Sequence, residues 1–126
     1  MWERWNSFTH ESGFGNAGMN SFNHYVYGAI GEWMYAGVAG LDLDPNEPGY
    51  RHLLFRPCPG GGMTSAEAAL QTRYGRAAIR WYLRDDTLVV DCTVPPNAQG
   101  TVSLSGQKPV KILSGDHQFS VVAHVD

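Results

Sequence analysis

The spacing of apolar residues changes near residue 45, and this change constrains the fold more than any other feature of the sequence. Between about residues 21 and 39, apolar side chains recur at intervals of three and four, the period of an amphipathic helix. Past residue 45 they alternate with polar side chains, as in β-strands with one buried face. The pattern predicts a mainly β chain: one long helix in residues 1–44, followed by a β-sandwich in residues 45–126.

The predicted helix follows an irregular, glycine-containing segment, residues 1–19, that we expect to be a loop. Asn20 or Ser21 is the expected N-cap, and Gly40 is the expected end of the helix. Gly28 and Gly31 lie on the side opposite the main apolar stripe, where each costs about 1 kcal/mol relative to alanine unless another backbone comes close. Both faces of the helix are therefore expected to be covered. The main apolar stripe consists of Phe22, Tyr25, Val26, Ala29, Ile30, Trp33 and Met34.

The β region is divided by turn-forming residues. A linker is expected at residues 42–50, a hairpin turn at Asp85 and Asp86, and a strand end at Pro95-Pro96-Asn97. Short strands at this spacing are typical of an antiparallel sandwich. The expected strands are residues 53–55, 63–72, 77–84, 88–94, 101–104, 110–113 and 119–125. In the last of them, the inward row would be Phe119, Val121, Ala123 and Val125.

Composition excludes several classes of protein. The net charge is −3 and no basic stripe is present, so nucleic acid is not an expected partner. Glu32 and several glycines interrupt the longest apolar stretch, so no membrane-spanning segment is predicted. The histidines and cysteines lack metal-ligand spacing, and neither a metal nor a cofactor is expected. Cys58 and Cys92 could form one disulfide, but two reduced, buried thiols are the preferred interpretation. The sequence does not assign a compartment.

Glu3 is the first candidate for chemistry, because it lies between Trp2 and Trp5 and beside Arg4. The indoles would exclude water and favour the protonated carboxyl, whereas Arg4 would favour the charged form. Such a carboxylate can act as a general base on water. A surface glutamate near two packed tryptophans is the alternative interpretation.

His24 is the second candidate, because the helix prediction puts it in the first turn. There the helix dipole disfavours the imidazolium, and a neutral imidazole suits hydrogen bonding to a hydroxyl group. The alternative is a histidine bonded to nearby backbone. The glycine run at residues 60–62 lacks the following Lys-Ser/Thr of a phosphate loop and is interpreted as a hairpin corner.

Several stretches together resemble the C-terminal region of bacterial α-L-rhamnosidases, a family of glycoside hydrolases. The resemblance covers nearly the whole chain, and its motifs occur in the family's order. They are WERWNS at 2–7, MNSFNHYVYGAIGEWMYAGVAGL at 19–41, PGYRHLLFRPCPGGGMTSAEAALQTRYGRAAIRWYL at 48–83, LVVDCTVPPNAQGTVSL at 88–104, and the terminal GDHQFSV.

This resemblance implies an (α/α)₆ barrel flanked by β-sandwiches, of which the predicted helix would be a remnant. It implies hydrolysis of terminal α-L-rhamnosides with inversion, and no metal in the acid/base step. Glu3 corresponds to the general base of a W-E-x-W motif. His24 corresponds to a sugar-contacting residue, and Trp2 and Trp5 would wall the pocket. Rhamnose-containing glycosides are thus the implied partners.

Inverting hydrolysis needs two carboxyl groups roughly 6.5–9.5 Å apart. Glu3 supplies only one of them, and the family's acid comes from a barrel loop upstream of the matching region. The chain is therefore expected to be a C-terminal fragment, inactive in isolation, that self-associates through its exposed helix. The alternative is a non-catalytic structural or carbohydrate-binding module, in which Tyr74 and Tyr82 could stack on sugars.

Overall fold

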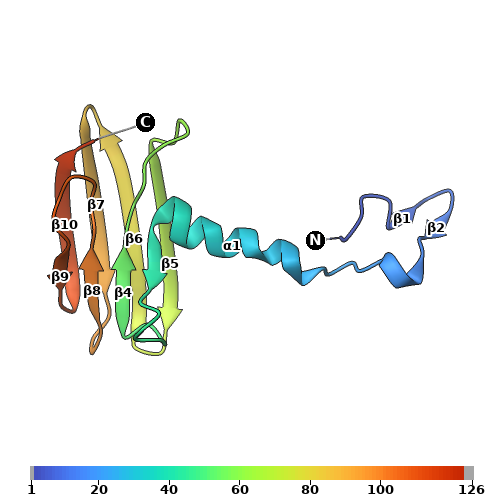
Figure 1. The fold of residues 1–126 in the computed structure, drawn as a ribbon, viewed down its shortest axis with the longest axis horizontal. Helices are drawn as coiled ribbons and strands as arrows, with labels where there is room; N and C mark the ends of the chain where they lie inside the picture. Colours follow the sequence, from blue (N-terminus) through green and yellow to red (C-terminus); the bar gives the residue numbers. More distant parts are fainter. Residues whose placement is uncertain (1, 124–126) are drawn as a thin grey trace. The chain divides into compact units, whose positions relative to one another are not determined.

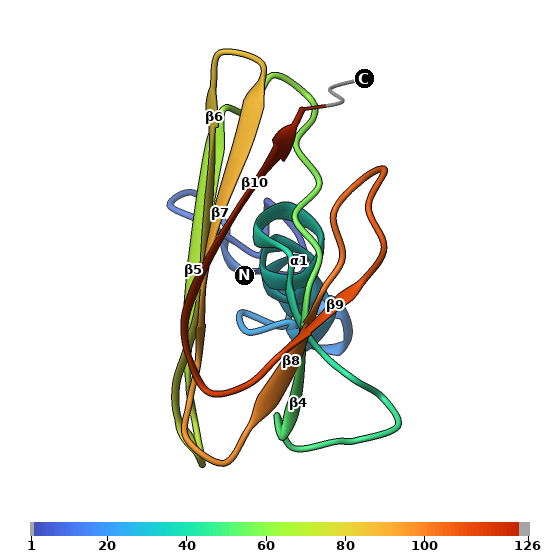
Figure 2. The ribbon, with the colours of Figure 1, turned by 90° about the vertical axis from the view of Figure 1, so that its left-hand side faces the viewer.

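The computed structural model describes residues 2–123 and divides the chain into two compact units, Met1–Trp33 and Met34–Asp126. The second unit is a β-sandwich, as the sequence predicts. Figure 2 shows its two layers in side view, and Figure 1 labels its strands except β3.

One sheet of the sandwich has the strand order β10-β7-β6-β5, and the other has the order β3-β4-β8-β9. Within residues 34–123, β4 and β8 form the single parallel pair, whereas a wholly antiparallel sandwich was expected. The strands of the first sheet are β5 (Ser65–Thr72), β6 (Gly75–Arg84), β7 (Thr87–Val94) and β10 (Gly115–Val122). Those of the second are β3 (Leu41–Leu43), β4 (His52–Phe55), β8 (Gln99–Val102) and β9 (Val110–Ile112).

The core lies between the two sheets, and the alternating rows predicted for β6 and β7 line it. Trp81 and Val90 are fully buried and are directly paired across the two strands. Removing such side chains from water is the main favourable contribution to folding. The buried cluster is Ala39, Leu41, Leu53, Phe55, Ala77, Ile79, Trp81, Leu88, Val90, Cys92, Val94, Ala98, Val102, Leu104 and Ile112.

Gly40 ends the helical segment where the sequence predicts. Its φ of +83° is a left-handed conformation that glycine adopts without strain. Its carbonyl accepts a hydrogen bond of 2.7 Å from the backbone N–H of Arg56. A Cβ atom here would lie 2.5 Å from the carbonyl carbon of Arg56 and from the nitrogen of Pro57, so only glycine fits this close approach.

The helix begins at Tyr25 rather than at residue 21, and neither Asn20 nor Ser21 caps it. In the first unit of the chain, the helix consists of a 3₁₀ turn, η2 (Tyr25–Gly28), and an α-helical segment, α1 (Ala29–Trp33). The second unit begins with a π-helical turn, η3 (Met34–Ala39). Before the helix, both backbone groups of Ser21 are bonded to Glu3.

The segment expected to be a loop contains short regular elements. Phe8–Thr9 (β1) and Gly13–Phe14 (β2) pair as a small antiparallel hairpin, and Ala17–Met19 (η1) forms a 3₁₀ turn. The hairpin turns back through Gly13, whose φ is +70°. This reversal brings Phe8 and Phe14 to a ring-centroid distance of 5.1 Å.

Three further expectations differ in part from the structure. Strand β3 lies partly in the segment interpreted as a linker, because Leu41–Leu43 pairs with β4. Strand β10 begins at Gly115, four residues earlier than predicted, and Val125 of its expected inward row lies outside the described residues. Cys58 and Cys92 are free thiols as expected, but Cys58 is exposed rather than buried.

No helix among the described residues is long and apolar enough to span a bilayer. The sandwich shows an inward apolar row and an outward polar row on its long strands, the pattern of a sheet with one solvated face.

Candidate active site

Glu3 is held to the segment before the helix by two reciprocal hydrogen bonds. Its backbone N–H donates to the carbonyl of Ser21 at 2.7 Å, and the N–H of Ser21 donates to Glu3 Oε2 at 2.9 Å. The side chain of Glu3 is 19% exposed. Main chain and carboxylate are thus fixed by the same residue, which limits the rotamers of Glu3.

His24 lies next to this carboxylate. Its Nε2 is 3.9 Å from Glu3 Oε1, and its side chain is 28% exposed. His24 also precedes the first helical residue, Tyr25, and its ring lies parallel to the Tyr25 ring at a centroid distance of 6.2 Å. Two residues that the sequence singles out separately, 21 positions apart in the chain, therefore lie close together.

The two tryptophans of the W-E-x-W motif differ in this structure. Trp2 is about half exposed and contacts Phe22 edge-on, with ring centroids 5.0 Å apart. Phe22 in turn packs against Phe14 at 5.7 Å, so Trp2 belongs to an aromatic chain that supports the loop carrying Glu3. Trp5 is fully exposed.

The geometry suits acceptance of a proton from water. The carboxylate accepts a hydrogen bond at Oε2 from the backbone N–H of Ser21, and its Oε1 lies 3.9 Å from Nε2 of His24. General-base catalysis requires such a group within hydrogen-bonding distance of the proton that it removes. Inverting hydrolysis further requires an acid carboxyl on the other side of the scissile bond.

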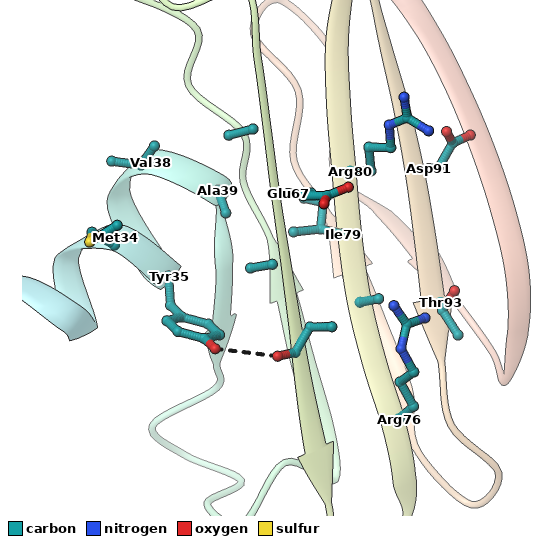
Figure 3. A pocket seen from close by; sticks show the side chains of 14 residues that line it. Met34, Tyr35, Val38, Ala39, Glu67, Arg76, Ile79, Arg80, Asp91 and Thr93 are labelled. Atoms are coloured by element: carbon teal, nitrogen blue, oxygen red, sulfur yellow. Dashed lines mark hydrogen bonds between the residues drawn. The ribbon is translucent and has the colours of Figure 1, made fainter.

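A groove in the second unit was not identified from the sequence. It has a volume of about 670 Å³ and lies where η3 meets the sheet (Figure 3). The hydroxyl of Tyr35 donates to the carbonyl of Ala69 at its edge, at 3.3 Å. Glu67, Arg80 and Asp91 stand in one cross-strand row on this sheet. In the sequence, the alternating outward positions of these three residues were the signal that could have indicated the groove.

Arginine guanidinium groups lie over the rings of both tyrosines that were considered for sugar stacking. The guanidinium carbons of Arg80 and Arg84 lie 5.5 and 5.9 Å from the ring centroid of Tyr82. That of Arg73 lies 5.7 Å from the Tyr74 ring. Cation–π contacts of this kind use the ring faces that a sugar would need. The structure therefore offers no observation in favour of sugar stacking at these residues.

Asp44, Glu47 and His52 form a group that could hold a metal ion, because one ligand atom of each lies within 4.8 Å of the others. The imidazole of His52 is nearly buried and already has hydrogen-bond partners. Its Nδ1 is 3.2 Å from Glu47 Oε1, and its Nε2 is 2.8 Å from the hydroxyl of Thr101. These bonds satisfy the ring, so the arrangement is explained without an ion.

The buried thiol of Cys92 is chemically inert. Burial, and secondly the negative charge of Asp91, raises the pKa of Cys92 to about 12. Because the thiolate is the reactive form, this side chain functions as part of the core.

Comparison with protein-family models gives two matches that together cover most of the chain. Residues 40–119 match the model of the bacterial α-L-rhamnosidase C-terminal domain. Residues 1–38 match the model of the bacterial α-L-rhamnosidase six-hairpin glycosidase domain. The two matches meet next to Gly40. The division expected between residues 44 and 45 stays a prediction, and strand β3 precedes it.

Characterised relatives agree with these matches. An α-L-rhamnosidase of Streptomyces avermitilis is 45% identical over 112 residues, which is 89% of this chain and 11% of that protein. The crystal structure of a Streptomyces avermitilis α-L-rhamnosidase complexed with L-rhamnose superposes with a TM-score of 0.77 and 39% identity, over 96% of this chain and 13% of that one. The native enzyme of Aspergillus terreus gives a TM-score of 0.79 and 35% identity, over 96% and 14%.

Proposed function

Because the chain belongs to the bacterial α-L-rhamnosidase family and matches only a small C-terminal part of its relatives, we propose that it completes the active site of an inverting α-L-rhamnosidase. In that enzyme, the carboxylate of Glu3 is the general base that activates water. The substrates are glycosides with a terminal α-L-rhamnose. One carboxylate cannot also supply the acid, so the chain alone is inactive.

The position of Glu3 beside His24 is the observation that carries this proposal. A base needs a fixed carboxylate, and the two bonds to Ser21 supply that. An imidazole 3.9 Å from the same carboxylate can hold a hydroxyl next to the reacting water. His24 therefore binds a hydroxyl of rhamnose. Trp2 and Trp5 wall the sugar pocket, a role that suits indoles with exposed faces.

The sandwich has a structural role in this proposal. Its core is apolar and continuous, and its one buried thiol is inert. The proposed division, residues 1–44 for the end of the barrel and 45–126 for the sandwich, gives the catalytic residues to the first part alone.

The experiment is a chimera in which this chain replaces the matching segment of the Streptomyces avermitilis enzyme. Release of rhamnose from an aryl rhamnoside is measured for the chimera and for its Glu3→Gln variant. We expect Glu3→Gln to lower kcat at least about a hundredfold, as expected for loss of a general base. Glu11→Gln, an exposed glutamate of the same unit, is the matched control. Near-normal turnover of Glu3→Gln would remove Glu3 from the mechanism.

We also propose that the isolated chain self-associates through its helix. Val26, Ile30 and Trp33 are each about half exposed or more. At about 25 cal/mol per Å² of apolar area, leaving this face in water is costly. Sedimentation at increasing concentration should show dimers or larger species, and Ile30→Glu should reduce them. A monomer at all concentrations would contradict the proposal.

A further inference from the structure

We propose that the groove in the second unit is a further binding site, for a neutral saccharide, on the outer face of strands β5, β6 and β7. This inference goes beyond the proposed function, because it involves neither Glu3 nor His24. The groove has a volume of about 670 Å³. Sites for small molecules commonly have volumes of about 300–1,000 Å³, so the groove is of a suitable size.

The groove is hollow because small side chains lie between long ones on the outer face of the sheet. Ala69, Ala78 and Thr93 are directly paired across β5, β6 and β7. On β6, Arg76 and Arg80 lie two residues to either side of Ala78, so their Cα atoms are about 14 Å apart. Ala69 is exposed, and Ala78, which is 9% exposed, lies deeper. The floor of the groove is therefore apolar and is flanked by two long polar side chains.

Side chains of opposite charge alternate along one row of the same face. Glu67 and Asp91 are the direct cross-strand neighbours of Arg80. Within residues 2–123, no ion pair joins Arg80 to either carboxylate. Its guanidinium carbon instead lies 5.5 Å from the ring centroid of Tyr82. Carboxylates have several acceptor sites and a guanidinium has several donors, so this row retains hydrogen-bonding capacity toward a ligand.

Hydrogen bonds to neighbouring elements orient the side chains around the groove. Asp91 Oδ1 accepts a hydrogen bond from Nε2 of Gln118, and the hydroxyl of Thr93 donates to Asp116 Oδ1, both at 2.7 Å. At the edge of β5, the hydroxyl of Tyr35 donates to a backbone carbonyl at 3.3 Å, which holds its ring beside the strand (Figure 3). Side chains that are already fixed lose less conformational entropy when a ligand binds.

The charge pattern favours an uncharged ligand with many hydroxyl groups. An anion would be repelled by Glu67 and Asp91. A cation would be repelled by Arg76 and Arg80. A hydroxyl group both donates to a carboxylate and accepts from a guanidinium, so it suits neighbouring groups of opposite charge. The alanine floor and the ring of Tyr35 suit the C–H face of a pyranose, so a neutral pyranoside combines the required properties.

The test is saturation-transfer NMR on the full 126-residue chain with the methyl pyranosides of D-glucose, D-galactose and D-mannose. None of these probes contains rhamnose, so binding at the site proposed around Glu3 is not what is measured. We expect saturable binding of at least one probe, with a Kd on the order of 1 mM.

Two substitutions on one strand locate the binding. Ala69→Leu fills the hollow from an exposed position and should weaken binding at least about tenfold. Ser65→Leu is the matched control, because Ser65 is an exposed residue on the same face of β5 and lies beyond the groove. Ser65→Leu should bind the probe as the unsubstituted chain does.

A third substitution tests the charge argument. Glu67→Gln removes one negative charge from the row, so at low ionic strength the affinity for methyl glucuronide should rise at least about threefold relative to methyl glucoside. An unchanged ratio would contradict the charge complementarity on which the inference rests. The inference would also be overturned by equal binding to Ala69→Leu and Ser65→Leu, or by no saturable binding of any neutral probe up to about 100 mM.

Discussion

Gly40 is the residue at which helical and extended backbone meet. Its φ of +83° and the 2.5 Å approach of Arg56 and Pro57 leave no room for a side chain. We expect Gly40→Ala to lower the free energy of unfolding by roughly 3 kcal/mol, from backbone strain and the clash together. Urea unfolding of the full chain followed by tryptophan fluorescence measures this loss.

Gly60 is the control for that prediction. It belongs to the glycine run between β4 and β5, which lie in different sheets, so the expected hairpin corner is wrong here. A Cβ at Gly60 would meet nothing within 4 Å. Gly60→Ala should therefore change the free energy of unfolding by less than about 0.5 kcal/mol. Equal effects of the two substitutions would show that the close approach at Gly40 does not limit stability.

The two cysteines should differ in reactivity. Cys58 is exposed, whereas burial raises the pKa of Cys92 to about 12. At pH 8 the Cys92 thiol is therefore almost wholly protonated as well as covered, and the thiolate is the form that reacts. A disulfide-exchange reagent should titrate one thiol per native chain and two in denaturant. Two fast thiols in the native chain would contradict the burial of Cys92.

At the scale of elements, a single indole joins strand β6 to the π-helical turn η3. The Nε1–H of Trp81, which is fully buried, donates to the carbonyl of Val38 at 3.1 Å. Trp81→Phe removes this donor and part of the core volume. We expect a loss of about 2–3 kcal/mol in the free energy of unfolding, since an unpaired, partly buried carbonyl is added to a cavity.

Tyr35→Phe is the matched change at the same turn. The hydroxyl of Tyr35 donates to the carbonyl of Ala69 at 3.3 Å, but this bond is exposed to water. Its loss should cost less than about 1 kcal/mol. The unfolding free energies of the two variants compare a partly buried bond of η3 with an exposed one. A larger effect for Tyr35 would contradict this ranking.

The long strands could be predicted because their periodicity follows directly from burial on one face. The inward row of β7, with Leu88, Val90, Cys92 and Val94, is buried as expected. The turn at Asp85 was also predicted from the sequence, and the φ of Asp85 is +52°. Local sequence determines these features, so local reasoning recovers them.

Features that depend on distant partners could not be predicted in this way. Strand β3 is only Leu41–Leu43, and it is a strand because β4 is beside it. The parallel pairing of β4 with β8 joins segments some 47 positions apart, from His52 to Gln99. The contact of Ser21 with Glu3, a partner 18 positions away, is likewise not indicated by the local sequence.

The candidate site, too, could be predicted from the sequence only in part. The types of Glu3 and His24 identify them as candidates, since a carboxylate between indoles and a histidine near a helix start suit acid/base and hydroxyl chemistry. Their proximity depends on the reversal through the β1–β2 hairpin, which the sequence did not indicate. The role of the Ser21 backbone could not be found from residue types at all, because every residue except proline carries the same donor.

At the scale of the whole molecule, the chain corresponds to a small part of its relatives. It spans 11% of the Streptomyces avermitilis relative, and its six-hairpin match covers residues 1–38 only. The first unit exposes many large apolar side chains that an intact barrel would cover. They are Trp2, Trp5, Phe14, Met19, Phe22, Tyr25, Val26, Ile30 and Trp33.

Hydrolysis of a glycoside with inversion needs a proton donor and a proton acceptor on opposite faces of the bond. Glu3 supplies the acceptor in our account, and the donor belongs to the remainder of the enzyme. In this account, we therefore expect that the carboxylate of Glu3 beside His24 is not sufficient for catalysis.

The measurement that tests this account most directly is rhamnose release by the purified 126-residue chain. We predict no hydrolysis of an aryl α-L-rhamnoside above the buffer rate, at any concentration at which the chain remains in solution. Rhamnose release that disappears in the Glu3→Gln variant of the same chain would contradict the account, because it would show that both catalytic groups lie within these residues.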